Sequence, residues 1–509
     1  MKFAAGGTRL VAYLALNLAC CVSMLVGAVI AGGSLAELPY VVLLLALCSS
    51  PILFISRIND KFALLGVLMA TFFMLFGLSD FISMFSPATG AGLNRGLSET
   101  EVVILIGAAM QLLGFFSVSR LAPAGSPGRL PEDWPRNLLV PIGLALWAAG
   151  NAATLFQTLV LFIGHGNMDV AAGLAKLGSW SAVLLFFVSK YAGPLGIIIL
   201  SYWWCVWDPR GGTAIMLLLI VAQVIVGWVV DTKEVALAAP LAIILTRTVC
   251  VGKLPVRWIL GALIGLTLFF PIMTAKRIIM TEDLGLTASA ALPRAMELLW
   301  RSIEEQTMLR AGKYTQNPQT FIERSSLKPS VELLVRNVGV THRYQMGSTL
   351  EPMLYTFMPR ILLTDTRSAN SAQTFNREFQ LSEDPDTYMS MSHLGEWYWN
   401  FGLVGVIVGM ALAGAAFGIV AVKCNPALGV SVTRVLVVVV TLYELAARGE
   451  GQISVQYVVW ARSLLVIGAL HLLLAQPRAL LILADPERHD ATPLIPDAQR
   501  QPSFRNLMP

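Results

Sequence analysis

Long apolar stretches, repeated along most of the chain, constrain its fold more than any other feature. A helix needs about 20 consecutive apolar residues to cross the hydrocarbon core of a bilayer. Stretches of about this length recur at residues 10–31, 37–56, 62–86, 102–122, 138–163, 179–204, 213–230, 234–251, 255–274, 397–422, 427–447 and 453–477. The sequence therefore predicts an all-α polytopic membrane protein with about twelve transmembrane helices. The seventh and eighth stretches flank Asp231, Lys233 and Glu234, so a tight hairpin or a re-entrant pair is the alternative there.

The composition supports this class of protein and excludes others. Of the 509 residues, 56% are hydrophobic and 13% are charged, whereas soluble domains have about 45–50% apolar and about 25% charged residues. Basic residues collect in the cytoplasmic loops of membrane proteins, so the net charge of +5 does not predict a nucleic-acid partner. All six cysteines lie in or beside apolar stretches, which argues against a disulfide framework or a zinc site.

The basic residues are distributed unevenly over the short loops. With the N-terminus in the cytoplasm, the outside loops carry little more than Arg95, Lys176, Lys233 and Arg448, and the inside loops carry most of the remaining loop arginines and lysines. Positive charge favours the cytoplasmic side, so we expect both termini to be cytoplasmic. In a bacterial host, the chain would be a multi-pass protein of the cell inner membrane.

One polar segment, residues 274–395, interrupts the apolar pattern. Ten arginines and three lysines fall within it, and the expected topology makes it a large periplasmic loop between spans 9 and 10. Residues 1–273 hold spans 1 to 9, residues 396–477 hold spans 10 to 12, and residues 478–509 have the composition of a disordered cytoplasmic tail. Within the loop, the apolar pattern predicts an amphipathic helix at 293–310 and shorter helices at 330–338 and 370–379.

Two parts of this loop combine residue types suited to an anionic substrate that arrives from the bilayer. Residues 336–347 read RNVGVTHRYQMG and bring Arg336, His342 and Arg343 close together. Further along, Pro359-Arg360 precedes residues 393–405, HLGEWYWNFGLVG, where the chain re-enters the membrane. Planar guanidinium groups can hold phosphate oxygens in pairs without a metal ion.

The order of these features resembles that of the Wzy-type polymerases, the bacterial O-antigen and exopolysaccharide repeat-unit polymerases. The resemblance lies in a lysine-containing helix hairpin at about 227–250, a long external loop with arginines, a Pro-Arg pair, and the pattern G-E-x-Y-x-N-F-G-x-x-G. It implies a glycosyltransferase that joins oligosaccharide repeat units carried on undecaprenyl diphosphate at the periplasmic face of the inner membrane. The lipid diphosphate would be the leaving group, and a chain-length regulator and a flippase would work beside the enzyme.

The basic candidates for binding the diphosphate or the sugar are Arg336, Arg343, Arg360, Arg277, Lys233 and Arg448. Arginine-x10-glycine motifs are typical of two outer loops in this family, and Arg336 to Gly347 has that spacing. The other candidate loop, 165–177, has no arginine, which departs from the pattern. The alternative for the loop arginines is surface ion pairing or contact with lipid headgroups. The resemblance favours Lys233, in the hairpin, and Arg448, in an Arg-Gly-Glu turn.

Glu396 is the first candidate for the general base that removes the proton of the acceptor hydroxyl. Its alternative is a carboxylate that stabilises the start of a helix. His342 is a second candidate for proton transfer, with a structural hydrogen bond as the alternative for both His342 and His393. Tyr398 and Asn400 either orient a sugar or belong to an aromatic belt at the membrane interface.

Neither a metal ion nor a cofactor is predicted. Asp384-Pro-Asp386 has a D-x-D pattern that holds divalent ions in many glycosyltransferases, but it lies within an acidic run. The first outer loop offers only Glu37 where large multispan transferases carry paired carboxylates. Lys190 lies within an apolar stretch and therefore needs a partner or a wet cavity.

Two other functions remain open. An O-antigen ligase has a similar multispan plan and the same leaving group, but transfers glycan to a lipid A core. A flippase for lipid-linked oligosaccharides is the alternative from another class. A flippase should carry its charges within the helix bundle and have two repeated halves. Here the charges concentrate in one outer loop and the halves differ in length, so the flippase ranks behind the polymerase and the ligase.

Overall fold

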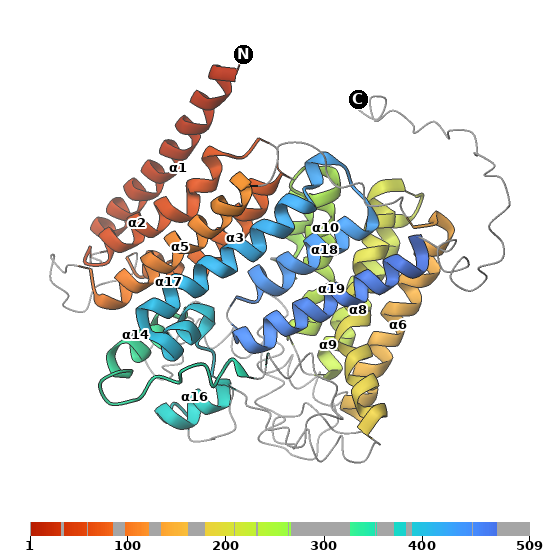
Figure 1. Ribbon diagram of the computed structural model, residues 1–509. Helices are drawn as coiled ribbons and strands as arrows, with labels where there is room; N and C mark the ends of the chain where they lie inside the picture. The colour runs from red at the N-terminus through yellow and green to blue at the C-terminus, as the bar shows by residue number, and fades with distance from the viewer. Residues whose placement is uncertain are drawn as a thin grey trace, which may run out of the picture.

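In the computed structural model, the described part of the chain is almost entirely helical (Figure 1). The described residues are 2–31, 35–56, 58, 60–84, 97–121, 134–160, 179–207, 209–230, 233–262, 264–265, 326–351, 353, 371–382, 389–449 and 451–475. No β-strand occurs among them. The prediction of an all-α fold is confirmed for these residues.

The helices of the first half are α1 (Lys2–Ala31), α2 (Leu38–Ser49), the 3₁₀ helix η1 (Ser50–Leu53), α3 (Lys61–Phe76), α4 (Leu78–Ser83), α5 (Glu99–Leu121), α6 (Arg136–Leu159), α8 (Ser179–Trp207), α9 (Gly212–Val230) and α10 (Lys233–Val251). Those of the second half are α14 (Lys328–Asn337), α16 (Ser371–Phe379), α17 (Ser392–Lys423), the 3₁₀ helix η4 (Pro426–Leu428), α18 (Val432–Thr441), the π-helix η5 (Leu442–Ala447) and α19 (Ile453–Ala475).

Seven of the described helices are long and apolar enough to cross a membrane, namely those in α1, α5, α6, α8, α9, α17 and α19. Three shorter apolar helices cover Leu38–Leu53, Lys61–Phe76 and Val235–Val251. The eleventh predicted span is divided between α18 and η5. Of the ninth, residues 256–262 are helical, and 266–274 lie outside the described residues. The chain is a multi-pass helical membrane protein, but the predicted number of twelve spans is not confirmed.

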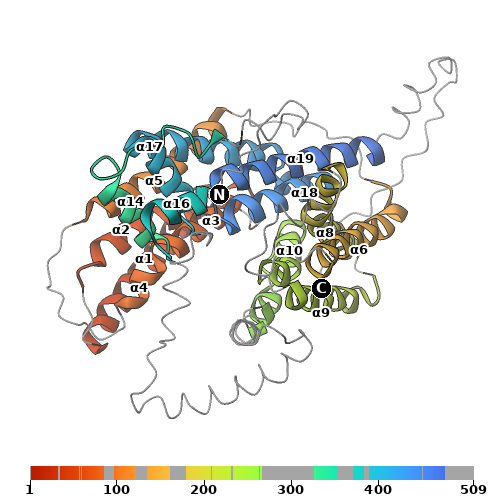
Figure 2. The same ribbon diagram turned by 90° about the horizontal axis from the view of Figure 1, so that it is seen from below.

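The helices form two groups that are joined by α18, η5 and α19 (Figure 2). In the first group, α2 packs against α1, α3, α4 and α5, and α3 packs against α4 and α5. Both α3 and α5 pack against α17. In the second group, α6 packs against α8 and α9, and α10 packs against α8 and α9. Because α18 contacts α8 and α10 while η5 contacts α3, this pair of helices touches both groups.

Glycine residues allow α5 and α17 to come into backbone contact. A Cβ atom built on Gly114 would lie 2.0 Å from the carbonyl oxygen of Ala411, and one built on Gly414 would lie 2.0 Å from that of Gln111. Any side chain at these positions would overlap the facing backbone. Such contacts are typical of helices in a bilayer, where close packing replaces the missing hydrophobic driving force.

The described parts of the long polar loop lie at one end of the bundle, at the bottom of Figure 1. There α14 packs on α5 and α17, and α14 and α16 confirm the short helices predicted at 330–338 and 370–379. We call this the α14 end. The predicted helix at 293–310 and the predicted tail at 478–509 lie outside the described residues.

We expect Gly414→Ala to destabilise the protein by about 1–3 kcal/mol, because the new methyl group must push α17 away from α5. The matched control is Gly468→Ala on α19, where a Cβ atom meets nothing within 4 Å. Alanine favours the helix there, so its stability should be unchanged or slightly higher. Thermal unfolding of both purified variants in detergent measures the difference, and an equal loss in both would contradict the proposed contact.

Candidate functional site

An interruption of α17 at Gly402 shapes the α14 end. Gly402 has φ 62° and ψ −149°, a conformation that is accessible essentially only to glycine. The break frees the carbonyl groups of Trp399 and Asn400 from the hydrogen bonds that a continuous helix would make. The backbone amides of Gln345 and Met346 donate to these two oxygens at 3.0 and 3.1 Å. The arginine- and histidine-containing part of the loop is therefore attached to the broken end of α17.

The side chain of Asn400 fastens the same loop from the inside. Asn400 is fully buried. Its Nδ2 donates to Thr349 Oγ1 at 2.6 Å and to the Glu396 carbonyl oxygen at 2.8 Å, while its Oδ1 accepts from the Gly347 amide at 2.8 Å. Asn400 thus holds the loop in place, and its predicted contact with a sugar stays a prediction.

Glu396 connects α17 to α19. It is 0% exposed, and its Oε2 accepts a hydrogen bond of 2.6 Å from the amide of Ile453, the first residue of α19. Its carboxylate lies at the positive end of the α19 dipole, which favours the charge. The hydroxyls of Thr349 and Ser371 lie nearby, but Oε1 has no hydrogen-bond partner among the described residues. Glu396 therefore stabilises a helix start, although of α19 and not of α17.

Polar contacts continue from α17 to the π-helix. His393 Nε2 contacts Gln456 Oε1, and Gln456 Nε2 donates to the carbonyl oxygen of Arg448. The Arg448 guanidinium lies 2.8 Å from Glu444 Oε2, and both side chains are largely buried. Glu444 belongs to η5, and π-helical turns are frequently found at functional sites. The structure thus links the predicted residue Arg448 to the segment that carries Glu396.

The two described candidate arginines of the loop, Arg336 and Arg343, lie at the surface. Arg336 pairs with Glu332 one turn earlier in α14, and its side chain is 67% exposed. Arg343 is also exposed. The His342 ring stacks on Phe379 with 4.4 Å between centroids. The surface ion pair considered for Arg336 is therefore present, while diphosphate binding by Arg336 and Arg343 stays a prediction.

The remaining predicted residues are placed only in part. Tyr398 is buried on α17, close to Tyr344 and Glu99. Lys233 begins α10, but its side chain is not described. The predicted ligands Arg277 and Arg360, and the Asp384-Pro-Asp386 pattern, lie outside the described residues.

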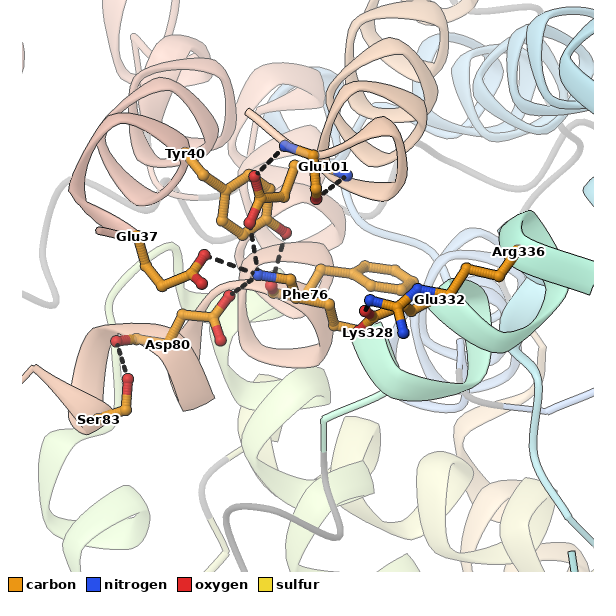
Figure 3. Close-up of polar contacts among 10 residues, drawn as sticks. Glu37, Tyr40, Phe76, Asp80, Ser83, Glu101, Lys328, Glu332 and Arg336 are labelled. Atoms are coloured by element: carbon orange, nitrogen blue, oxygen red, sulfur yellow. Dashed lines mark hydrogen bonds and ion pairs between the residues drawn. The ribbon is translucent and has the colours of Figure 1, made fainter. Parts of the chain in front are cut away.

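A buried group of charges that the sequence did not predict lies beside this site (Figure 3). The Lys328 ammonium is 2.7 Å from Asp80 Oδ2, 2.8 Å from Glu101 Oε1 and 3.0 Å from Glu37 Oε2. It also lies 4.5 Å from the centre of the Tyr40 ring. We call Lys328, Glu37, Asp80 and Glu101 the Lys328 cluster.

Each acidic residue of the cluster is positioned by the start of a different helix. Glu37 precedes α2, Asp80 lies in the first turn of α4, and Glu101 lies in the first turn of α5. Glu101 also forms a capping box, since its Oε2 accepts from the Ser98 amide at 2.8 Å and its own amide donates to Ser98 Oγ at 3.3 Å. One ammonium group therefore attaches α14 to three helices of the first group.

The surroundings of the cluster shift its proton affinities. Burial, together with a hydrogen bond to the carboxyl group of Glu101, raises the pKa of Glu37, and burial raises the pKa of Asp80. Burial opposes the charge on Lys328, but the carboxylates of Asp80, Glu101 and Glu37 more than offset this effect, so the pKa of Lys328 is raised. Lys328 therefore stays positively charged, and Glu37 and Asp80 take up protons more readily than free carboxyl groups do.

Only part of this cluster has a signal in the sequence. Ser98-Glu99-Thr100-Glu101 is a capping-box pattern. Lys328 occupies the first turn of a helix, where the dipole disfavours a cation, and this unfavourable position suggests another partner. The acidic partners lie up to 291 positions from Lys328 along the chain, so no spacing rule identifies them.

A second polar region lies inside the bundle. Lys190, Tyr191, Tyr443, Glu444 and Ser463 contribute to the lining of a small pocket. The pocket lies between α8, α10, α18, η5 and α19. Lys190, for which the sequence predicted a partner or a wet cavity, thus lies beside the acidic partner of Arg448.

No arrangement of three or more His, Cys, Asp or Glu side chains suited to a metal ion occurs in the described part of the chain. In the Lys328 cluster, the ammonium takes the central position among the carboxylates.

No family model, no curated protein and no solved structure matches this chain. Its family and function therefore remain proposals that rest on the motifs and on the geometry of the α14 end.

We expect Lys328→Met to destabilise the protein by about 3–5 kcal/mol near neutral pH, because three carboxyl groups lose their shared cation. The matched control, Arg336→Met, removes an exposed pair worth at most about 1 kcal/mol. Thermal unfolding in detergent measures both, and similar small losses would contradict the structural importance of the cluster.

The loss of stability caused by Lys328→Met should become smaller as the pH falls from about 8 to about 5. In the wild type, the pKa of Lys328 is raised, so its contribution to folding stability is fully present at any pH below the pKa of an unfolded lysine. In the variant, ionised Glu37 and Asp80 destabilise the folded protein because no cation faces them. This destabilisation disappears as the two carboxyl groups bind protons. The same unfolding measurement over this pH range tests the prediction, and a constant difference from the wild type would contradict it.

Proposed function

We propose that this protein is a membrane glycosyltransferase that polymerises oligosaccharide repeat units carried on undecaprenyl diphosphate at the periplasmic face of the bacterial inner membrane. The convergence of the three candidate segments at the α14 end supports the proposal. Residues 345–347 bind residues 399–400, Glu396 binds Ile453, and His393 is linked through Gln456 to Arg448. With both termini in the cytoplasm, the α14 end faces the periplasm.

The proposed reaction makes two chemical demands. A hydroxyl of the non-reducing-end sugar of an incoming unit attacks the anomeric carbon of the growing chain and loses its proton to a base. The bond from that carbon to the diphosphate oxygen breaks, and the diphosphate leaves with the electron pair. The site therefore needs a proton acceptor and cationic groups that stabilise the developing negative charge.

The α14 end offers residues for both demands. Glu396 Oε1 has no hydrogen-bond partner among the described residues and is the first candidate atom for the proton. His342, on a partly exposed ring at the loop, is the second. Arg336 and Arg343 present guanidinium groups to the outside for the diphosphate, and Arg448 lies on the bundle side of the site.

A flippase for the same lipid-linked substrate is the second candidate function. Lys190 and Glu444 favour it, because both line one small pocket and place ionisable groups within the bundle. A flippase would move the oligosaccharide across the membrane without forming a glycosidic bond.

Product analysis separates these functions. The purified protein is reconstituted in liposomes with a labelled undecaprenyl-diphosphate repeat unit, with and without EDTA, and the products are separated on a gel. The proposal expects a ladder spaced by one repeat unit that EDTA does not change. Transfer only when a lipid A core is supplied would instead indicate an O-antigen ligase, and transbilayer movement of the label without a new bond would indicate a flippase.

Glu396→Gln should abolish the ladder, with a loss of at least about 10²-fold in rate, while leaving the thermal midpoint near that of the wild type. Glutamine can still accept the hydrogen bond from the Ile453 amide, but it cannot take a proton. Glu396→Ala loses this bond as well and should unfold more easily by about 1.5–3 kcal/mol. A ladder of normal rate from Glu396→Gln would limit Glu396 to holding α19 and leave proton removal to His342.

Arg343→Gln should slow the ladder by about 10²-fold, because one cation is removed from the leaving group. Arg377→Gln, which changes an exposed arginine on α16 outside the candidate site, is the matched control and should keep a normal ladder. Rates from gels at matched protein amounts test this, and equal rates in the two variants would remove Arg343 from the site.

A further inference from the structure

The turn at residues 338–347 exposes large apolar side chains within an otherwise polar loop. Val340 is 80% exposed and Met346 is 74% exposed, and part of the Tyr344 ring is also accessible. Large apolar side chains grouped at a surface usually mark a site of contact. The exposed apolar side chains of the turn therefore suit contact with lipid or with another molecule.

The backbone holds this turn in a defined shape. The Gly339 amide donates to the His342 carbonyl oxygen at 2.7 Å, and the His342 amide donates to the Asn337 carbonyl oxygen at 3.0 Å. Met346 has φ 51°, a left-handed conformation that methionine rarely adopts, and its amide is bound to the broken end of α17. The exposed position of Met346 is thus imposed by hydrogen bonds.

The apolar surface of the turn continues onto α17. Phe401, Val404, Val408 and Leu412 are exposed along α17, which is long and apolar enough to cross a membrane. A Cβ atom built on Gly347 would lie 3.4 Å from Phe401 Cζ, so the turn adjoins the outer end of this row. An occupant that covers both surfaces has to extend along a transmembrane helix, as the bilayer does.

We propose that the 338–347 turn is an interfacial anchor that inserts Val340 and Met346 among the phospholipids of the leaflet at the α14 end. The exposed guanidinium of Arg343 lies in the same turn and complements the lipid phosphates. Apolar anchors next to a basic side chain are the usual means of binding at the headgroup boundary. The anchor places the broken end of α17 at the level of the headgroups, whatever reaction the protein performs.

Depth-dependent quenching tests this anchor. Val340→Cys and Met346→Cys are labelled with an environment-sensitive NBD dye, and the full chain is reconstituted in vesicles of phosphatidylethanolamine and phosphatidylglycerol. Lipids that carry a quenching doxyl group near the headgroup or deep in the acyl chain are then added. Thr374→Cys, an exposed polar position on α16, is the matched control, and the labelled wild type gives the background from native cysteines.

The proposal expects shorter-wavelength emission at positions 340 and 346, and quenching by the shallow doxyl lipid at least about twofold greater than at position 374. Equal quenching at all three positions would overturn it. Shielding from water without quenching by lipid would also overturn it, because a protein would then cover the turn. Both substituted side chains are exposed, so thermal midpoints equal to the wild type verify folding.

The anchor and the proposed function are tested separately. Quenching does not require a substrate, so the two assays give independent results. A ladder on the product gel without quenching by lipid would contradict the anchor alone. Quenching by lipid without a ladder would contradict the polymerase function alone.

Discussion

A backbone carbonyl that leaves its helix inside an apolar bundle must find another donor, since neither lipid nor an apolar side chain supplies one. The α14 end depends on this constraint. Gly402 breaks α17 and releases two carbonyl groups, and the amides of Gln345 and Met346 satisfy them. The loop is consequently part of the hydrogen bonding of α17 and not a separate lid. Asn400 adds two further hydrogen bonds to the loop from the buried side, so the loop and the broken helix form one unit.

The Lys328 cluster holds the same region from the opposite side. Burying an ammonium group costs several kcal/mol, and such a site stays favourable only when acidic partners are close and well oriented. Here three helix starts supply them at 2.7–3.0 Å. The Lys328 ammonium joins α14 to the starts of α2, α4 and α5, and so fixes where α14 lies against the first helix group. Glu396 acts similarly between α17 and α19, where a buried carboxylate meets a helix start.

The sequence predicts the helices and the convergence of its motifs far better than the contacts between them. Apolar length and helical periodicity depend on neighbouring residues, which is why seven of the predicted spans and the helices α14 and α16 are confirmed. The break at Gly402 was not predicted, because glycine is frequent in transmembrane helices and its conformation depends on tertiary contacts. Lys328 was missed for a related reason: its partners come from three distant helices. The exposed side chain of Arg336 pairs with Glu332 four positions earlier, and its role as a substrate ligand stays a prediction.

The π-helix η5 has a mechanical consequence. An extra residue in a helical turn changes the side to which the following residues point. α18 packs on α8, α10 and α17, and η5 packs on α3 and α10. The continuous segment formed by α18 and η5 therefore contacts both groups of helices. Glu444 and its partner Arg448 lie in this segment and directly after it. Gln456 and His393 connect Arg448 to α17 on the N-terminal side of its break, so one chain of polar contacts runs from the segment that joins the two helix groups to the α14 end.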